Sequence, residues 1–186
     1  MKFEATKDQI TLHGLGFLQV ILPGNQRIHV WHPDLPRRKC FEHSSIHDHR
    51  FGFISKVLIG RQINQLYRVN NNASESLFTH KAYLHEGPRT EFGNRPWSED
   101  FQCRLEPVGD PRIVIPGEQY EMNPYMLHGT YCNGITVTLM TKTTEEKVGA
   151  HSYCEIDVKP DIDFDRKQWS QNKLWEIFTE AMKLSN

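Results

Sequence analysis

Residues Ser44–Phe53, which read Ser-Ser-Ile-His-Asp-His-Arg-Phe-Gly-Phe, carry two histidines separated by a single residue. Side chains alternate between the two faces of a β-strand, so a strand through this segment places His47 and His49 on one face. Two imidazoles on one face need only one or two further ligands to hold a transition metal. The segment therefore predicts part of a metal site; the alternative is a pair of surface histidines beside a turn.

A third histidine is predicted to point toward the protein interior. Asn133-Gly134 is a strong signal for a two-residue β-turn, and it lies between candidate strands at 127–132 and 135–141. Counting outward from this turn, His128 faces Leu139. Apolar residues alternate with threonines along 135–141, and directly paired residues share a face of a sheet. His128 is therefore expected on the buried side.

The rest of the chain predicts an all-β barrel or jelly roll in residues 1–160, because short strands with turn signals predominate. The polar segment 87–100, broken by glycine and proline, predicts a long surface loop that can act as a lid over a site. Residues 161–186 predict a C-terminal amphipathic helix, with capping chemistry at 163–168. This helix either covers the barrel or forms a dimer contact.

Composition excludes several classes of protein. The 186 residues have a formal net charge of −1 and no basic tract, so no nucleic-acid partner is expected. No apolar run is long enough to span a membrane, and residues 1–8 lack the apolar core of a secretion signal, so a cytoplasmic protein is expected. The four cysteines are far apart in the sequence and are predicted to be free thiols.

The spacing of histidines and glycines resembles the two motifs of the cupin superfamily. In the first motif a glycine follows His-x-His by eleven or twelve residues, and Gly60 lies eleven residues after His49. In the second motif a glycine precedes a single histidine by eleven residues, as Gly117 precedes His128. The resemblance implies an RmlC-like jelly-roll barrel with His47, His49 and His128 as metal ligands.

The chain departs from these motifs at two places. The second motif has a proline and a glycine where this chain has Asn123 and Tyr125. Cupins commonly place a glutamate four or five residues after the second histidine, where this chain has Phe53 and Ile54. Phe53 falls on the face of His47 and His49, so an apolar ring replaces the carboxylate. Three neutral imidazoles then leave coordination positions open to water, substrate or dioxygen.

A three-histidine centre of this kind resembles that of the cysteine dioxygenase family of thiol dioxygenases. The likeness runs from Ile28 to Met140, and it is strongest at Ser44–His49 followed by Lys56-x-Leu58-x-Gly60. It implies Fe(II), although imidazoles also suit Zn, Ni, Mn and Cu. The cysteine that the family carries after the second ligand is missing from 51–54, and its His-x-Tyr pair is missing from 135–143.

Candidate residues for chemistry and substrate binding surround the predicted ligands. Tyr120 and Tyr131 are candidates to orient substrate or supply a proton, and Arg50 and Arg61 to bind an anionic substrate. Phe53 is a candidate for apolar contact with the substrate. No role is predicted for the other histidines, which include His13, His29, His85 and His151.

Three functions remain open from the sequence. The first is a mononuclear, dioxygenase-like metalloenzyme that oxidises a small substrate, for which a thiol is one candidate. The second is a non-catalytic cupin that binds a small molecule or a partner. The third is a cupin epimerase or isomerase with a histidine base and a tyrosine acid. Cupins often form homodimers, which makes a dimer an expectation from fold analogy alone.

Overall fold

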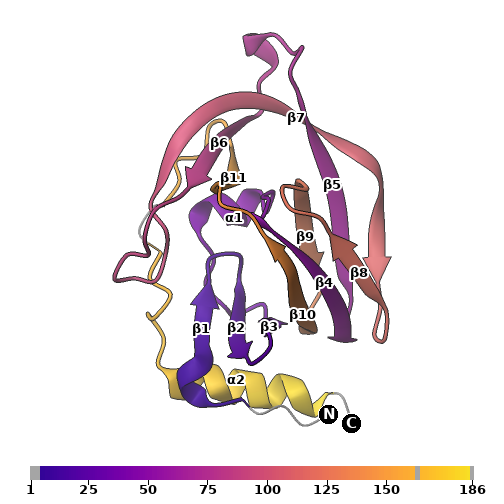
Figure 1. Ribbon diagram of the computed structural model, residues 1–186, viewed down its shortest axis with the longest axis vertical. Coiled ribbons are helices and arrows are strands. Elements are labelled where there is room, and N and C mark those ends of the chain that lie inside the picture. Colours follow the sequence, from indigo (N-terminus) through magenta and orange to yellow (C-terminus); the bar gives the residue numbers. More distant parts are fainter. Residues whose placement is uncertain (1–4, 162–163, 185–186) are drawn as a thin grey trace.

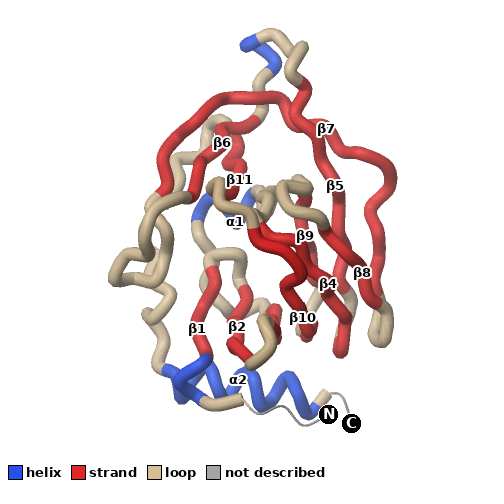
Figure 2. The backbone as a smooth tube through the Cα atoms, in the orientation of Figure 1, coloured by secondary structure: helices blue, strands red, loops and turns tan. Residues whose placement is uncertain are grey.

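Two antiparallel sheets form the body of the molecule (Figures 1 and 2). The computed structural model describes residues 5–161 and 164–184. In the first sheet the strand order is β1-β2-β3-β10-β4-β8, and in the second it is β11-β6-β7-β5-β9. In Figure 1, β7 arches across the upper part of the molecule, below the segment that joins β5 to β6, and α2 crosses beneath β1 and β2. The predicted all-β, jelly-roll-like class with a C-terminal helix is confirmed.

The strands of the first sheet are β1 (Ile10–His13), β2 (Phe17–Leu22), β3 (Gln26–Trp31), β4 (Phe51–Ile59), β8 (Gln119–Met122) and β10 (Thr136–Glu145). Those of the second are β5 (Gln62–Asn70), β6 (His80–His85), β7 (Trp97–Val114), β9 (His128–Cys132) and β11 (Ala150–Glu155). The helices are α1 (Lys39–His43) and α2 (Gln171–Lys183), with 3-10 turns η1 (Lys7–Gln9) and η2 (Glu75–Leu77).

The first sheet separates an apolar layer from a polar cavity by the alternation of its side chains. On β3, Ile28 and Val30 join the hydrophobic cluster that includes residues of α2. The intervening Arg27, His29 and Trp31 line a cavity on the opposite face. β10 repeats the pattern beside β3, so one strand pair supplies both the core and a wall of the cavity.

α2 packs its apolar side against this first sheet. Leu174, Phe178 and Ala181 are spaced four and three residues apart and belong to the same hydrophobic cluster as Ile28. The helix begins later than the sequence predicts: its cap is Ser170, whose hydroxyl accepts a hydrogen bond from the Lys173 amide. Of the predicted capping segment, residue 163 lies outside the described residues.

No described helix is both long and apolar enough to cross a bilayer.

The predicted hairpin around Asn133-Gly134 is wrong. β9 pairs with β5, in the second sheet, while β10 pairs with β3 on one edge and with β4 on the other. Both edges of β10 are therefore occupied, and no edge remains for β9. The turn connects the two sheets, and His128 is buried because β9 faces the cavity, not because it lies opposite Leu139.

The predicted surface loop ends earlier than expected. β7 begins at Trp97, so the irregular segment spans residues 86–96. Its backbone is fastened to the chain that precedes α2, because the Phe92 carbonyl accepts a hydrogen bond of 3.2 Å from the Arg166 amide. Arg89, Asn94 and Arg95 from this loop line the cavity.

The prediction that all four cysteines are free is wrong for two of them. Cys40 of α1 and Cys154 of β11 form a disulfide with a Cα–Cα distance of 5.2 Å. Their separation of 114 residues conceals the pairing in the sequence, and α1 packs against β11 only in the folded chain. Cys103 and Cys132 are free.

We expect reduction of this disulfide, or the Cys40→Ser substitution, to lower the free energy of unfolding by about 2–5 kcal/mol, because the bond constrains a long loop of the unfolded chain. Urea unfolding with and without a thiol reductant measures the effect. The double variant Cys40→Ser/Cys154→Ser is the control, since reductant should not change its stability. Equal stability of the oxidised and reduced wild-type protein would contradict the assignment.

Gly60 closes the turn between β4 and β5, and only glycine suits this position. Its φ is +76°, and a Cβ atom there would collide with the Ile135 carbonyl oxygen. We expect Gly60→Ala to cost about 2–4 kcal/mol of stability from backbone strain and steric conflict. Gly24 is a matched control, because its φ is +69° but no atom of the described residues lies within 4 Å of its Cβ position. Gly24→Ala should cost only about 1 kcal/mol. Thermal unfolding of the two variants measures both losses of stability. Equal losses in Gly60→Ala and Gly24→Ala would be evidence against a collision with the Ile135 carbonyl oxygen.

Candidate metal centre

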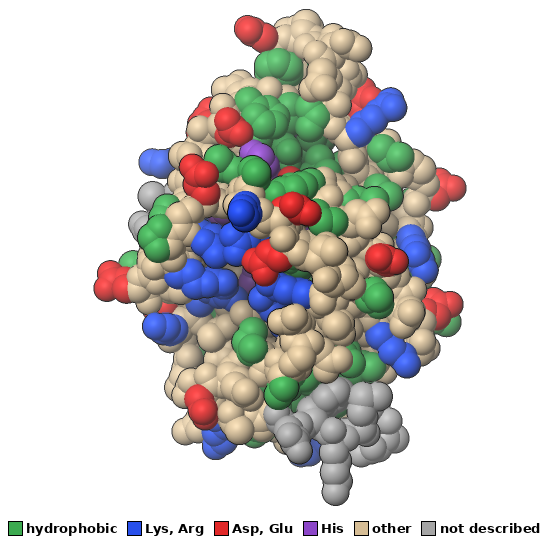
Figure 3. All heavy atoms as spheres, viewed as in Figure 1, with side chains coloured by type: hydrophobic (Ala, Val, Ile, Leu, Met, Phe, Trp, Pro, Cys, Tyr) green, Lys and Arg blue, Asp and Glu red, His purple; other side chains and the backbone are tan. Residues whose placement is uncertain are grey.

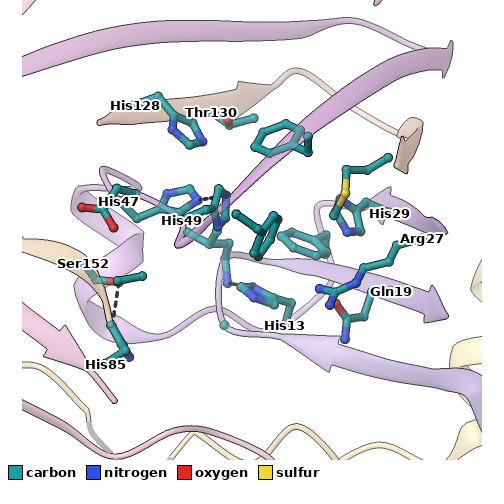
Figure 4. A pocket seen from close by; sticks show the side chains of 18 of the residues that line it. His13, Gln19, Arg27, His29, His47, His49, His85, His128, Thr130 and Ser152 are labelled. Atoms are coloured by element: carbon teal, nitrogen blue, oxygen red, sulfur yellow. Dashed lines mark hydrogen bonds between the residues drawn. The ribbon is translucent and has the colours of Figure 1, made fainter. Parts of the chain in front are cut away.

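Three histidines converge in the cavity between the sheets, as Figure 4 shows. One ligand atom from each of His47, His49 and His128 lies within 4.8 Å of the others. The Nε2 atoms of His47 and His49 are 3.2 Å apart, and the His47 and His128 ring centroids are 4.5 Å apart. The predicted meeting of these side chains on one face is confirmed, and the group can hold a metal ion.

The backbone around His47 differs from the predicted strand. β4 begins only at Phe51, and His47 lies in an extended segment between α1 and β4. Here His47 forms isolated β-bridges to His128 on one side and to Ser152 on the other. The His47 amide donates to the His128 carbonyl at 2.9 Å, and the His128 amide returns a bond of 3.0 Å. Two ligands are thus tied together directly through their main chains.

Hydrogen bonds to backbone carbonyl oxygens set the orientation of two of the histidine rings. His47 Nδ1 lies 2.7 Å from the Ser45 carbonyl oxygen, and His128 Nδ1 lies 2.8 Å from the Met126 carbonyl oxygen. A carbonyl accepts only, so each Nδ1 carries the proton and each Nε2 presents a lone pair. Metal-binding histidines in proteins are commonly anchored in this way. The donor set therefore fits a metal ion.

His49 is positioned by aromatic rings and by a strained neighbour. Its ring stacks on Phe51 at 4.8 Å and meets Phe53 edge-on at 5.4 Å. Its carbonyl accepts a hydrogen bond of 2.7 Å from the Tyr125 amide. Tyr125 has a φ of +60° at the position where the cupin motif has glycine, so the backbone there keeps the left-handed conformation without the glycine.

Burial keeps the three ligands neutral. Desolvation is the largest cause lowering the pKa of His47 to about 3, and it also lowers the pKa of His49 and His128. The neighbouring imidazoles add to the effect for His47 and His49. Because a metal binds the neutral imidazole, the three histidines could coordinate one without losing protons at neutral pH.

No carboxylate joins the three histidines in the described part of the chain. Phe53 stands in the cavity wall at the position where the cupin motif carries a glutamate, and its ring lies 6.3 Å from that of His128. Asp48 is turned toward His151 instead: its Oδ1 accepts a hydrogen bond of 2.8 Å from the His151 amide. Hydrogen bonding to Asp48 is also the first cause raising the pKa of His151.

The cavity, about 250 Å³ in volume, contains some of the predicted site residues and excludes others. Tyr120, Phe53 and Arg50 line it. Tyr131 lies outside, 42% exposed, with its hydroxyl 3.3 Å from that of Tyr67, because it alternates with the inward-facing Thr130 on β9. Arg61 is exposed at the turn after Gly60 and also lies outside the cavity.

Four histidines without a predicted role line the cavity: His13, His29, His85 and His151. A signal for one of them exists in the sequence. His29 alternates with Arg27 and Trp31, opposite the apolar Ile28 and Val30, so the period of two places these three side chains on one face. That face resembles a solvated one until the second sheet covers it.

Comparison with models of protein families and with curated proteins found no match for the chain. The function is therefore argued from the side chains of the site, because a fold of this class supports many activities.

Proposed function

We propose that the protein is a mononuclear metalloenzyme in which His47, His49 and His128 hold one divalent metal ion. The observation that supports this most is the pair of Nδ1–carbonyl bonds that turn the Nε2 atoms of His47 and His128 toward His49. Fe(II) is the proposed metal, with Zn, Ni, Mn or Cu as alternatives that three imidazoles also accommodate. The likeness to the cysteine dioxygenase motif favours iron.

The proposed reaction is oxidation of a small molecule by dioxygen. A bound metal would supply open coordination positions and Lewis acidity. Phe51 and Phe53 place apolar rings against His49, which keeps bulk water from that side of the centre. Tyr120 is buried in the same wall, and burial raises the pKa of its hydroxyl to about 12, so it retains a proton that it can donate to the substrate.

Oxygen consumption tests the proposal. The protein loaded with Fe(II) under anaerobic conditions is mixed with oxygenated buffer and a panel of small thiols and small organic acids. Consumption that depends on one substrate and disappears in His128→Ala is the expected result. His80→Ala is the matched control, because His80 lies on β6 outside the cavity. If the iron-loaded protein consumes no oxygen above the His128→Ala background with any substrate, dioxygenase activity on these two classes is rejected.

A binding protein without catalysis is the second candidate. Several buried polar atoms of the cavity wall have no hydrogen-bond partner in the described structure, including His29 Nε2, Trp31 Nε1 and Thr138 Oγ1. Unpaired buried donors and acceptors favour a polar ligand that completes them. Ligand binding that persists without metal, together with no turnover, would favour this candidate.

A further inference from the structure

Positive charge gathers in the cavity beyond the three histidines. Of the described residues that line the cavity, seven are Lys or Arg, whereas two are Asp or Glu. Figure 3 shows Lys and Arg side chains clustered near the middle of one face of the molecule. The excess of positive charge inside a partly desolvated cavity favours an anion there.

The two acidic side chains are already engaged. Glu145 accepts a hydrogen bond of 2.7 Å from Arg50 and lies 3.6 Å from the Lys142 ammonium. Asp48 is bonded to His151, as described above. Among the described residues, no carboxylate lies within ion-pair distance of three other cavity arginines. These are Arg27, Arg89 and Arg166, here called the arginine cluster.

Arg166 shows the need for a counter-ion most clearly. Its side chain is buried, with 9% exposure, and its Nε donates to the Leu12 carbonyl at 2.8 Å. Among the described residues, its buried Nη2 has no hydrogen-bond partner. A buried guanidinium with an unpaired nitrogen is costly, and guanidinium groups match the geometry of carboxylate and phosphate oxygens.

The charge of Arg89 acts on Arg27 and Arg166 although the three arginines come from distant parts of the chain. Arg27 is on β3, Arg89 is on the loop at residues 86–96, and Arg166 precedes α2. After burial, the charge of Arg89 is the next cause lowering the pKa of both Arg27 and Arg166. This mutual repulsion would be relieved by an anion bound between them.

We propose that the arginine cluster binds a doubly charged anionic group of the cavity ligand, either a phosphate monoester or a pair of neighbouring carboxylates. A single carboxylate would leave at least two of the three charges without a counter-ion, whereas a dianion can bridge them. The loop at residues 86–96 thereby has a role in binding, because it carries Arg89. The identification of this ligand as the substrate rests on the proposed metalloenzyme function; the anion site itself does not.

Phe51 connects the two ends of the cavity. Its ring stacks on His49 with a centroid distance of 4.8 Å, and the Arg27 guanidinium carbon lies 5.8 Å from the same ring. Figure 4 shows Arg27 and His29 across the cavity from the three converging histidines, with aromatic rings between them. A ligand anchored at the arginine cluster therefore has to extend past the ring of Phe51 to reach the three histidines.

Calorimetric titration of the 186-residue chain with inorganic phosphate, malonate and acetate tests the proposal. We expect phosphate or malonate to bind at least about tenfold more tightly than acetate, because three guanidinium groups face the anion. Tighter phosphate binding would identify a phosphate ligand, and tighter malonate binding a dicarboxylate. Equal affinities for all three anions would overturn the proposal.

Substitutions locate the binding. Arg27→Met and Arg89→Met should each weaken binding of the preferred anion at least about tenfold, while Arg27→Lys should lose less because it keeps the charge. Arg61→Met is the matched control, since Arg61 is exposed outside the cavity. Arg89 lies on a loop, so its variant tests the site even if Arg27→Met fails to fold. Wild-type affinity in a folded Arg89→Met or Arg27→Met protein would refute the cluster.

The same titrations separate this proposal from the metal function. His128→Ala should bind the anion with unchanged affinity, and Arg89→Met should retain its metal. If the wild-type protein binds the anion in an Arg89-dependent way but takes up no metal, the arginine cluster stands and the metalloenzyme proposal fails. If the wild-type protein takes up metal but shows no Arg89-dependent anion binding, the arginine cluster is rejected and the metalloenzyme proposal stands.

Discussion

Replacing His128 with alanine is expected to reduce the affinity for a divalent metal by about 100-fold or more. Mutation of a residue that only orients a metal ligand already lowers metal affinity by about 10–100-fold, and loss of a ligand itself should cost at least as much. His128 supplies one of the three ligand atoms, and its ring orientation is set by the Met126 carbonyl. His47→Ala and His49→Ala should have effects of the same size, because no carboxylate in the group can compensate. Metal titration by calorimetry or a competing chelator measures the loss.

His80→Ala provides the comparison for this series. It removes an imidazole of the same size from β6, outside the cavity, and should leave metal affinity within about twofold of wild type. Circular dichroism of all four variants checks that the sheets remain folded. Retention of wild-type metal affinity by folded His47→Ala and His128→Ala proteins would show that the metal binds elsewhere.

Lowering the pH from 7 to 5 should destabilise the metal-free protein by several kcal/mol. Burial, as the largest cause, lowers the pKa of His29, His47 and His85 to about 3, against 6.5 in the unfolded chain. Below pH 6.5 the unfolded chain therefore binds protons that the folded chain cannot bind. The stability from these neutral side chains is complete above pH 6.5, and it falls by about 1.4 kcal/mol per pH unit for each histidine until about pH 3.

His151 acts in the opposite direction. Hydrogen bonding to Asp48 is the largest cause, and it raises the pKa of His151. Burial lowers this pKa by a smaller amount, and hydrogen bonding to Asp100 raises it further. Its contribution is present below pH 6.5 and is lost as the pH rises through the raised value, so it offsets part of the acid effect. Urea unfolding of metal-free protein at pH 7, 6 and 5 measures the sum.

A single substitution tests which side chains cause this dependence. His85→Gln keeps a polar side chain near Ser152, to which His85 Nε2 is bonded at 2.8 Å, but it removes one titrating group. Its stability should fall less steeply with pH, by about 1.4 kcal/mol per pH unit. A free energy of unfolding that stays constant between pH 7 and 5 would be incompatible with a cavity of neutral histidines.

The meeting of His47 and His49 could be predicted from the sequence because their positions depend on short-range rules. A period of two places His47 and His49 together, and Gly60 marks the turn eleven residues after His49, where the backbone has φ of +76°. The fold class followed from strand and turn patterns in the same way. The prediction that the two rings meet holds although the predicted strand is wrong at this point. His47 lies outside any regular strand, yet its ring still meets that of His49.

The sheet partners and the rest of the cavity depend on long-range pairing, which no local signal specifies. Asn133-Gly134 indicates a turn, but whether β9 and β10 then pair depends on β3 and β4, which occupy both edges of β10. The Cys40–Cys154 disulfide and the arginine cluster likewise join residues that are distant in the sequence. That Arg27 and His29 line the cavity becomes evident only once the second sheet covers their face.

Metal stoichiometry with ligand identification is the most direct test of the three-histidine centre. The purified protein is reconstituted anaerobically with Fe(II), freed of excess metal, and examined by elemental analysis and X-ray absorption spectroscopy. We predict one iron per chain, coordinated by three imidazole nitrogens, and little or no iron in His128→Ala. A wild-type protein that retains no metal, or that holds it without imidazole ligands, would contradict the account.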